Sequence, residues 1–540
     1  MENAKEMVED FIRNYKEISI QNKLPSLNLE MKSSKDEFYD ADYCMGTFQI
    51  QASNPLVSAY AIHSLKIAAL SGHHADFLGK MSPKFNLRPL WIECDLSIQT
   101  ESDMHWAIPN YLGEVEQQII FAKRMISLGY NAIILGARDH VLPKQAKELS
   151  LEKICRTFQH FGIKVILKPI FSEKMAHLNE HIFLEEIKKI DSFDYLFIES
   201  GSVLSHLLTS VDQRELTSAD QALYEVRFFE KILGNQYGLI YSILSRDGEA
   251  ALDQAMWLPH FCDDVGAHTI IAFSAVSDDP INDHAPPHPI WDVLRELLDV
   301  SATPLMPILN VGGIHQGEGL WPSLAVDCVD HYYSRCQRHH FAGIIHLVNH
   351  LPHPGAVLDC SLWVASQATW SHLSAVLLAE TWFAAYYPEM NYRGLADIWK
   401  KNREIAIELS AMRSLTNEKN RDKISSEECK ALSESLLARL HYLQEFLRRD
   451  GGRNQTFNAY CTSFIRDAKR IIHHFLQCFN VSIGYSLKGE DFAPSFWTAV
   501  QEGGGQGLRG GAKILFLDKP NQGEENNQMN QIYKANRLFT

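Results

Sequence analysis

YNAIILGA, residues 130–137, is a short run of branched apolar residues that ends against a polar loop. A continuous run of this kind, without alternating polar residues, is typical of a strand buried on both faces of a parallel sheet. Similar runs recur at intervals of roughly 30 to 40 residues, the length of one strand–helix–strand repeat. They are RPLWIECD (88–95), IKVILKPI (163–170), DYLFIES (194–200), YGLIYSIL (237–244), HTIIAFSA (268–275), TPLMPILN (303–310) and FAGIIHLV (341–348).

The segments between these runs carry helical patterns. EVEQQIIFAKRMISLG (114–129) repeats its apolar residues at intervals of three and four and ends in a glycine. Eight strands that alternate with helices predict a (β/α)₈ TIM barrel. The alternative is an open, doubly wound sheet, but no GxGxxG motif follows the first run, and eight repeats favour closure.

The predicted barrel has further segments on both sides. Residues 37–72 read as a strand, a turn at Asn54-Pro55 and an amphipathic helix that ends at Gly72, and long helical patterns recur in residues 371–480. We therefore predict four parts: an N-terminal α/β accessory domain (1–87), the barrel (88–370), an α-helical C-terminal region (371–490) and a flexible tail rich in Gly, Asn and Gln (491–540).

Composition restricts the class of protein. The 540 residues are 46% hydrophobic and 22% charged, as in globular proteins, and no apolar run is long enough to span a membrane. A formal charge of −15 opposes binding to nucleic acid. The N-terminal residues are charged throughout, unlike a secretion signal, and the ten cysteines include no CxxC pair, so we expect a cytoplasmic protein.

Polar residues follow the predicted strands, at the end where barrels of this class carry their active sites. Loops are polar in any protein, so a part of this set is expected to be only solvated. As candidate catalytic residues we take Glu199, Asp278, Asp279 and Glu318. The candidate substrate-binding residues are Glu93, Asp95, Arg138, Asp139, Lys168, Arg246, Asn310, His346, Asn349 and Trp363.

Carboxylates around a barrel mouth suggest glycoside hydrolysis, in which two acids flank the bond that is cleaved. Tryptophans near the rim, such as Trp363, suit the C–H face of a sugar, although each one taken alone is more often core packing. The histidine cluster HLVNHLPH (346–353) permits a metal site, but the first strand lacks a His-x-His pair. No Gly-x-Ser-x-Gly motif occurs either. We predict neither a metal nor another cofactor.

The order of elements over about residues 37–390 resembles the α-glucuronidases of glycoside hydrolase family 67 and the related hexosaminidase-like barrels. The order carries the resemblance, since no single segment is specific. The segments are FQIQASNPLVSAYAIHSLKIAALSG (48–72), SPKFNLRPLWIECD (82–95), YLGEVEQQIIFAKRMISLGYNAIILG (111–136), FAGIIHLVNH (341–350) and LDCSLWVASQATW (358–370). The resemblance implies a TIM barrel that acts on a carbohydrate. Because some enzymes of the family dimerise through their C-terminal helices, it also makes a homodimer an expectation.

The catalytic positions of the family are not retained in place. Its general acid lies in a turn after the fourth strand, and Val203 occupies the matching position here. Glu199 lies four residues earlier, where such barrels carry a lysine that is expected to bind the uronate carboxylate. A carboxylate at this point would repel a uronic acid unless it is protonated or paired. The family's aspartate after the sixth strand is matched by Asp278 or Asp279. Its glutamate on the seventh strand falls on Ile308.

Two functions remain open. The first is a divergent glycoside hydrolase that acts on an oligosaccharide, with Glu199 or Glu318 as the general acid and Asp278 or Asp279 as the base or charge stabiliser. Glu318 is the nearest substitute for the missing glutamate of the seventh strand. The second is a catalytically inactive barrel that binds a glycan or a protein partner, with the C-terminal helices as its docking surface. Fold alone does not decide between them.

Overall fold

The computed structural model describes most of residues 2–92 and 104–136, and then separate stretches of the chain. These stretches are 97–98, 151–171, 183–185, 192–201, 217–243, 248–266, 268–274, 303–311, 329–330, 341–348, 357–388, 408–409, 424–449 and 455–483, with a few single residues between them.

Eight parallel strands form a closed barrel, which confirms the predicted fold class and excludes the open sheet. Every strand lies within one of the eight apolar runs. In the order of pairing around the barrel they are β5 (Pro89–Ile92), β8 (Ala132–Leu135), β9 (Lys164–Leu167), β11 (Tyr195–Glu199), β12 (Gly238–Ile243), β13 (Thr269–Ser274), β14 (Leu305–Asn310) and β15 (Ile345–Val348), which pairs with β5 again.

The strands are apolar throughout because both of their faces are buried. Trp91, Ile134, Phe197 and Ile240 belong to a cluster that fills the inside of the barrel. Their strand neighbours, such as Ile198, belong to a second and larger cluster between the barrel and the elements that cover it. Side chains alternate between the two faces of a strand, so each run supplies both cores.

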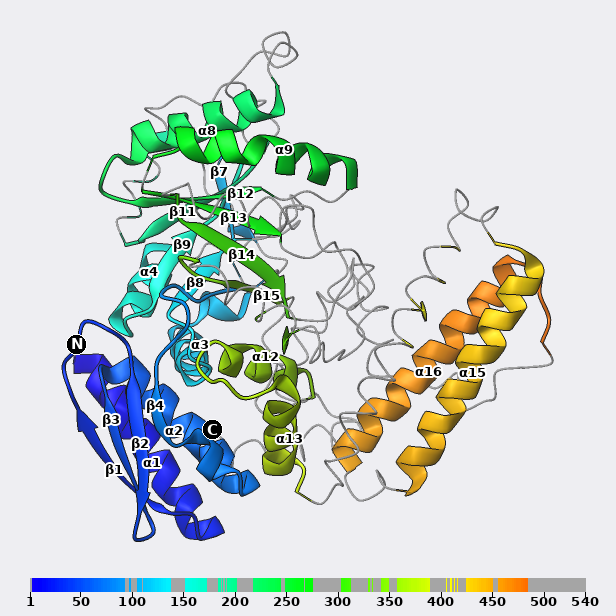
Figure 1. Ribbon diagram of the computed structural model, residues 1–540, viewed down its shortest axis with the longest axis horizontal. Coiled ribbons are helices and arrows are strands. Elements are labelled where there is room, and N and C mark those ends of the chain that lie inside the picture. The colour runs from blue at the N-terminus through cyan, green and yellow to red at the C-terminus, as the bar shows by residue number, and fades with distance from the viewer. Residues whose placement is uncertain are drawn as a thin grey trace.

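Helices cover the barrel, and one of them, α3 (Val115–Ser127), ends where the sequence predicts. It is followed by Gly129 with φ +81°, and α8 (Ser218–Leu233) begins at a capping box formed by Thr217 and Asp220. The other covering helices are α4 (Leu151–His160), α9 (Gly248–Asp264) and α12 (Val357–Ala368), and α13 (Ala375–Tyr386) packs on α12 and α2. In Figure 1, α8 and α9 lie over one side of the barrel, at the top of the view.

The N-terminal part is a four-stranded sheet with two helices. Its strands β1 (Ser26–Met31), β2 (Tyr39–Cys44), β3 (Thr47–Ala52) and β4 (Gly79–Met81) pair in the order β1-β3-β2-β4. Helices α1 (Glu2–Asn22) and α2 (Pro55–Ser71) pack together beside this sheet (Figure 1). The predicted turn is confirmed, because Asn54 caps α2 and Gly72, with φ +78°, ends it.

The sequence had suggested an amphipathic helix before Gly72, but α2 is not amphipathic in the structure. All of its residues from Val57 to Ala68 are buried, because α1, α3 and α13 pack on it in addition to the sheet. A helix that is enclosed on every side needs no polar face. This burial ties the N-terminal sheet to the covering helices of the barrel.

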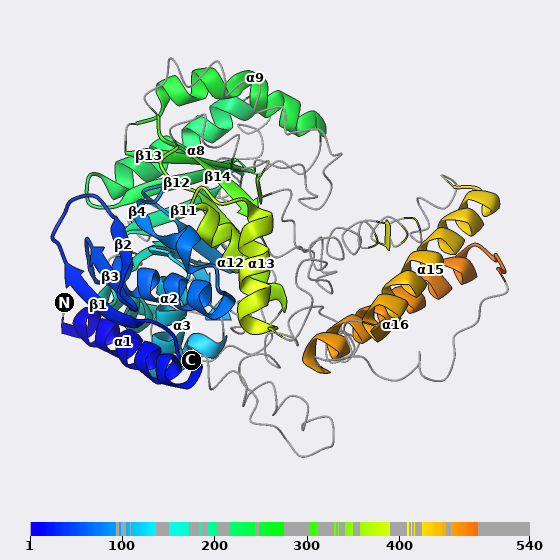
Figure 2. The ribbon, with the colours of Figure 1, turned by 60° about the horizontal axis from the view of Figure 1, so that its bottom comes forward.

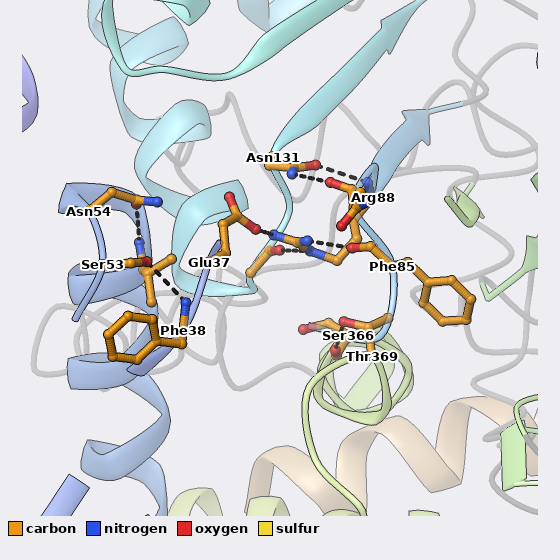
Figure 3. Close-up of polar contacts among 12 residues, drawn as sticks. Glu37, Phe38, Ser53, Asn54, Phe85, Arg88, Asn131, Ser366 and Thr369 are labelled. Atoms are coloured by element: carbon orange, nitrogen blue, oxygen red, sulfur yellow. Dashed lines mark hydrogen bonds and ion pairs between the residues drawn. The ribbon is translucent and has the colours of Figure 1, made fainter. Parts of the chain in front are cut away.

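Arg88, one residue before β5, joins the N-terminal sheet to the barrel (Figure 3). Its guanidinium donates to the carbonyls of Phe85 and Gly129 and forms an ion pair with Glu37, with 2.6 Å between Nη2 and Oε2. The guanidinium also lies over the ring of Trp370, 4.8 Å from its centroid. Five planar N–H donors allow arginine to satisfy several acceptors at one buried point.

The C-terminal region contains two long helices, as predicted. α15 (Ser426–Arg449) and α16 (Gln455–Cys478) pack side by side, and they stand apart from the barrel in both views (Figures 1 and 2). Leu436, Leu440, Leu443 and Leu447 form the buried stripe of α15 at spacings of four and three. In the described part of the chain, none of the helices combines the length and hydrophobicity of a membrane span.

Candidate active site at the barrel mouth

The carboxyl ends of the parallel barrel strands meet at one end of the barrel, which we call the mouth. Phe197 of β11 and Ile240 of β12 face the inside of the barrel. Side chains on a strand alternate with a period of two, so Glu199 and Ser242, two residues further along, also face inward. Lys168 directly follows β9 and reaches Glu199 from the neighbouring strand.

Lys168 and Glu199 form a buried ion pair at the mouth. The distance between Lys168 Nζ and Glu199 Oε2 is 2.9 Å, and the two side chains are 3% and 13% exposed. The ammonium also lies 5.8 Å from the ring centroid of Trp91, which packs beneath it inside the barrel. Two charges removed from water at this point are costly unless they meet each other, so the pair fixes both side chains.

The backbone around Lys168 is packed closely against the second strand. The carbonyl of Gly136 accepts a hydrogen bond of 2.8 Å from the Trp91 indole, and a Cβ on Gly136 would lie 2.4 Å from Lys168 Cβ. Only glycine fits at this contact without displacing Lys168. The glycine that ends the YNAIILG run therefore allows the lysine to approach the mouth.

Glu225 of α8 holds the turn that follows Glu199. This buried carboxylate accepts hydrogen bonds from the Gly201 N–H, at 2.9 Å, and from the Tyr241 hydroxyl, at 2.7 Å. Burial raises the pKa of Tyr241 well above its usual value, so the hydroxyl keeps the proton that it donates. The chain beyond β11 is thus fixed from behind, on the side away from the barrel interior.

A three-stranded antiparallel sheet adjoins this part of the mouth. It consists of β6 (Ser97–Ile98), β7 (Met104–Ala107) and β10 (Pro169–Phe171), and β10 begins directly after Lys168. Trp106 of β7 is opposite Pro169 and is buried. The sheet therefore holds the backbone on the carboxyl side of Lys168.

Only a part of the predicted site is described. Of the candidate catalytic residues, Glu199 is placed, whereas Asp278, Asp279 and Glu318 lie outside the described residues. Of the substrate-binding candidates, Lys168 is placed beside Glu199, and Asn310 is the last residue of β14. The others outside the described residues are Glu93, Asp95, Arg138, Asp139, Arg246 and Asn349.

His346 does not face the mouth. Its ring is fully buried on the outer side of β15, between the hydroxyls of Tyr130, at 2.7 Å, and Tyr333, at 2.5 Å. The Tyr333 hydroxyl donates to the carbonyl of Ala365, so it accepts from His346 Nε2, and Tyr130 donates to Nδ1. Burial lowers the pKa of His346 to about 3, which keeps the ring neutral. We therefore correct the substrate-binding assignment of this histidine to a structural one.

Trp363 is also away from the mouth. It is fully buried on α12, and its ring lies 6.2 Å from that of Phe77 in the N-terminal part. A side chain enclosed in this contact has no surface to offer a sugar, so Trp363 is a core-packing residue. Within the described residues, no three His, Cys, Asp or Glu side chains come together as a metal site would require.

Sequence reasoning missed Ser242, Gly136 and Glu225. Ser242 could have been found from the apolar run of β12, by counting two residues from an inward position, had the inward face been known. Gly136 was visible only as the end of a run. Glu225 carries no sequence signal, because a glutamate within a helical pattern is usually exposed.

Comparison with known proteins concerns the fold. No protein-family model matches the sequence, and no curated protein is significantly similar to it. A GH138 enzyme targeting the pectin rhamnogalacturonan II is similar in structure with a TM-score of 0.51 and 11% identity, over 87% of this chain and 69% of that one. A family 89 glycoside hydrolase from Clostridium perfringens in complex with PUGNAc has a TM-score of 0.48 and 9% identity, over 100% of this chain and 78% of the other. The structural neighbours thus include glycoside hydrolases, and the likeness at this identity is one of fold.

Proposed function

We propose that this protein is a divergent glycoside hydrolase that acts on an oligosaccharide at the barrel mouth. The observation that carries the proposal is the position of Glu199. This carboxylate lies at the carboxyl end of a barrel strand, turned inward and held in place by Lys168. This is the position from which barrel enzymes present their catalytic side chains.

The ion pair defines the role that Glu199 takes in this proposal. A carboxylate that accepts from an ammonium is in the form that takes up a proton or stabilises positive charge, and not in the form that donates a proton. Cleavage of a glycosidic bond passes through a transition state like an oxocarbenium ion, which an adjacent carboxylate stabilises. We assign Glu199 to this anionic role and keep Glu318 as the proton donor.

The pair also bears on the sugar. Lys168 already shares its charge with Glu199, so this position supplies no separate cation for the carboxylate of a uronic acid. A neutral sugar fits this part of the mouth better than a uronate. The proposal therefore does not extend the α-glucuronidase resemblance to the substrate, and Glu199 takes the charge-stabilising role for which Asp278 or Asp279 was the sequence-based candidate.

The test is hydrolysis by the full chain. The protein is incubated with a panel of aryl glycosides and neutral oligosaccharides, and the released sugar is measured. Glu199→Gln is expected to lower the rate by about 10² to 10⁴-fold, as loss of a positioned acid or base does. Glu116→Gln, on the exposed face of α3, is the matched control and should leave the rate unchanged. Full turnover by Glu199→Gln would remove the assignment.

One observation favours the second function, a catalytically inactive barrel that binds a glycan or a protein. The position that carries the acid in the related family holds Val203, and the nearest carboxylate is occupied by Lys168. Calorimetric titration with the same panel separates the two functions. Binding of an oligosaccharide without any release of sugar by the wild type would support the inactive barrel, and hydrolysis would reject it.

A further inference from the structure

Two polar atoms inside the mouth are buried, and the described residues supply neither with a hydrogen-bond partner. They are Oε1 of Glu199, the oxygen that is not engaged by Lys168, and Oγ of Ser242. Ser242 is fully buried, and the Glu199 side chain is largely so. Buried polar groups in folded proteins are nearly always hydrogen-bonded, so a pair of such atoms calls for an explanation.

The two atoms belong to neighbouring residues of the barrel wall. Glu199 and Ser242 are register partners in β11 and β12, and parallel strands lie about 4.8 Å apart. The Ser200 N–H donates to the carbonyl of Ser242 at 2.9 Å, which continues the pairing one residue past the end of β11. The backbone therefore fixes the two side chains next to each other, both directed inward.

The chemistry of the two atoms is complementary to one kind of group. Glu199 Oε1 only accepts, whereas the Ser242 hydroxyl donates a proton. A single hydroxyl oxygen that lies between them can donate to the carboxylate and accept from the serine. An apolar group could do neither, and an anion would be repelled by the carboxylate.

We propose that Glu199 Oε1 and Ser242 Oγ form a subsite that binds one hydroxyl group of a polyhydroxylated ligand. The inference deepens the proposed function, on which it rests for the identity of the ligand as a sugar, and it makes Ser242 a determinant of which sugar is accepted.

The experiment measures affinity, so that it does not depend on turnover. Glucose, galactose, mannose, N-acetylglucosamine and their monodeoxy analogues are titrated into the full-length wild type and into Ser242→Ala, by calorimetry or by ligand-observed NMR. Ser433→Ala is the control, because Ser433 is a buried serine of α15 whose hydroxyl donates to the Cys429 carbonyl far along the chain. Circular dichroism checks that each variant is folded.

Removal of one particular sugar hydroxyl should weaken binding to the wild type strongly and binding to Ser242→Ala less. We expect Ser242→Ala to weaken binding of the preferred sugar by about 3- to 10-fold, and the critical deoxy analogue to bind the wild type about 10- to 100-fold more weakly. In Ser242→Ala, the affinity difference between the preferred sugar and that deoxy analogue should be smaller than in the wild type. Equal affinities of wild type and Ser242→Ala for every sugar bound would overturn the subsite, even if hydrolysis is found. No binding of any sugar in the panel would overturn it as well.

The proposed function can fail separately. Sugar binding that depends on Ser242, together with no hydrolysis of any glycoside, would leave the subsite standing and reject the hydrolase. Hydrolysis that depends on Glu199, together with equal sugar affinities of the wild type and Ser242→Ala, would support the hydrolase and reject the subsite.

Discussion

Two buried places in this protein are built from the same three kinds of side chain. At the joint with the N-terminal sheet, Arg88 pairs with Glu37 and lies over Trp370. At the barrel mouth, Lys168 pairs with Glu199 and lies over Trp91. Both basic side chains are 3% exposed. The two clusters are thus alike in composition, and they differ in the hydrogen bonds that their charged groups make.

At the joint the hydrogen bonds go to fixed partners. Arg88 donates to two main-chain carbonyls as well as to Glu37, whose side chain is 24% exposed and so remains partly in water. At the mouth, the second oxygen of Glu199 is buried and no described residue donates to it. The hydrogen bonds at the joint are thus made within the protein, whereas our proposal assigns the missing donor at the mouth to a ligand. Buried charge by itself does not mark a functional site.

Neutralising both members of the mouth pair tests this difference most strongly. Lys168→Met combined with Glu199→Gln removes two buried charges together, so the free energy of unfolding should stay near that of the wild type or increase. Turnover should fall by about 10² to 10⁴-fold, because the carboxylate is lost. Urea unfolding and the glycoside assay measure the two effects. A variant that unfolds easily would show that the mouth pair is structural like the joint.

The opposite pattern is expected at the joint. Arg88→Met leaves Glu37 without its counter-charge and two buried carbonyls without their donor, which should lower the free energy of unfolding by about 3–5 kcal/mol. The same urea titration measures this loss. Turnover per folded molecule should be unchanged, since Arg88 does not reach the mouth. A selective loss of turnover with normal stability would contradict the separation of the two places.

Glu225 should combine both kinds of effect at a lower magnitude. Glu225→Gln weakens the hydrogen bonds to Gly201 and Tyr241, so stability should fall by about 1.5–3 kcal/mol and turnover should fall less than in Glu199→Gln. Glu230→Gln is the matched control. Glu230, on the same helix, accepts from Gly266 and Thr269 at the opposite end of the barrel strands. Equal turnover in the two variants would remove the positioning role of Glu225.

The last effect is a pH dependence of stability that involves helix α2 rather than the two ion pairs. Burial, together with the charge of Arg124, lowers the pKa of Lys66 on α2 to about 8 in the folded protein. The unfolded chain keeps the usual value near 10.5, so between pH 8 and 10.5 it binds more protons than the folded chain does. The free energy of unfolding should therefore rise with pH across this window, by at most about 1.4 kcal/mol per pH unit. Lys66→Met should flatten the curve in urea titrations. An unchanged slope would show that Lys66 keeps an ordinary pKa.

The barrel could be predicted because its strands obey a local rule. A strand buried on both faces must be apolar along its whole length, so the runs around Trp91, Phe197 and Ile240 identify themselves. Helix ends followed the same logic at Gly72 and Gly129, whose positive φ favours glycine. Glu199 was found as the acid at the end of such a run.

The same continuity hid which residues face inward. In β15, His346 lies among apolar residues on both sides, and nothing in that run tells the inner face from the outer one. We predicted that His346 faces the substrate, whereas its ring lies on the outside of the barrel and contacts Tyr130 and Tyr333. Trp363 was misplaced for a related reason, since a tryptophan after the last strand fits either a rim or a covering helix.

The sequence by itself therefore determined the number and place of the barrel strands, the helices between them and the presence of a carboxylate at residue 199, because these depend on periodicity and on chain ends. Only the tertiary structure decided that Lys168 pairs with this carboxylate, that Glu225 holds the turn behind it and that Ser242 stands beside it. These contacts join residues that are 16 or more positions apart, and their formation depends on strand register and barrel closure, which no local pattern encodes.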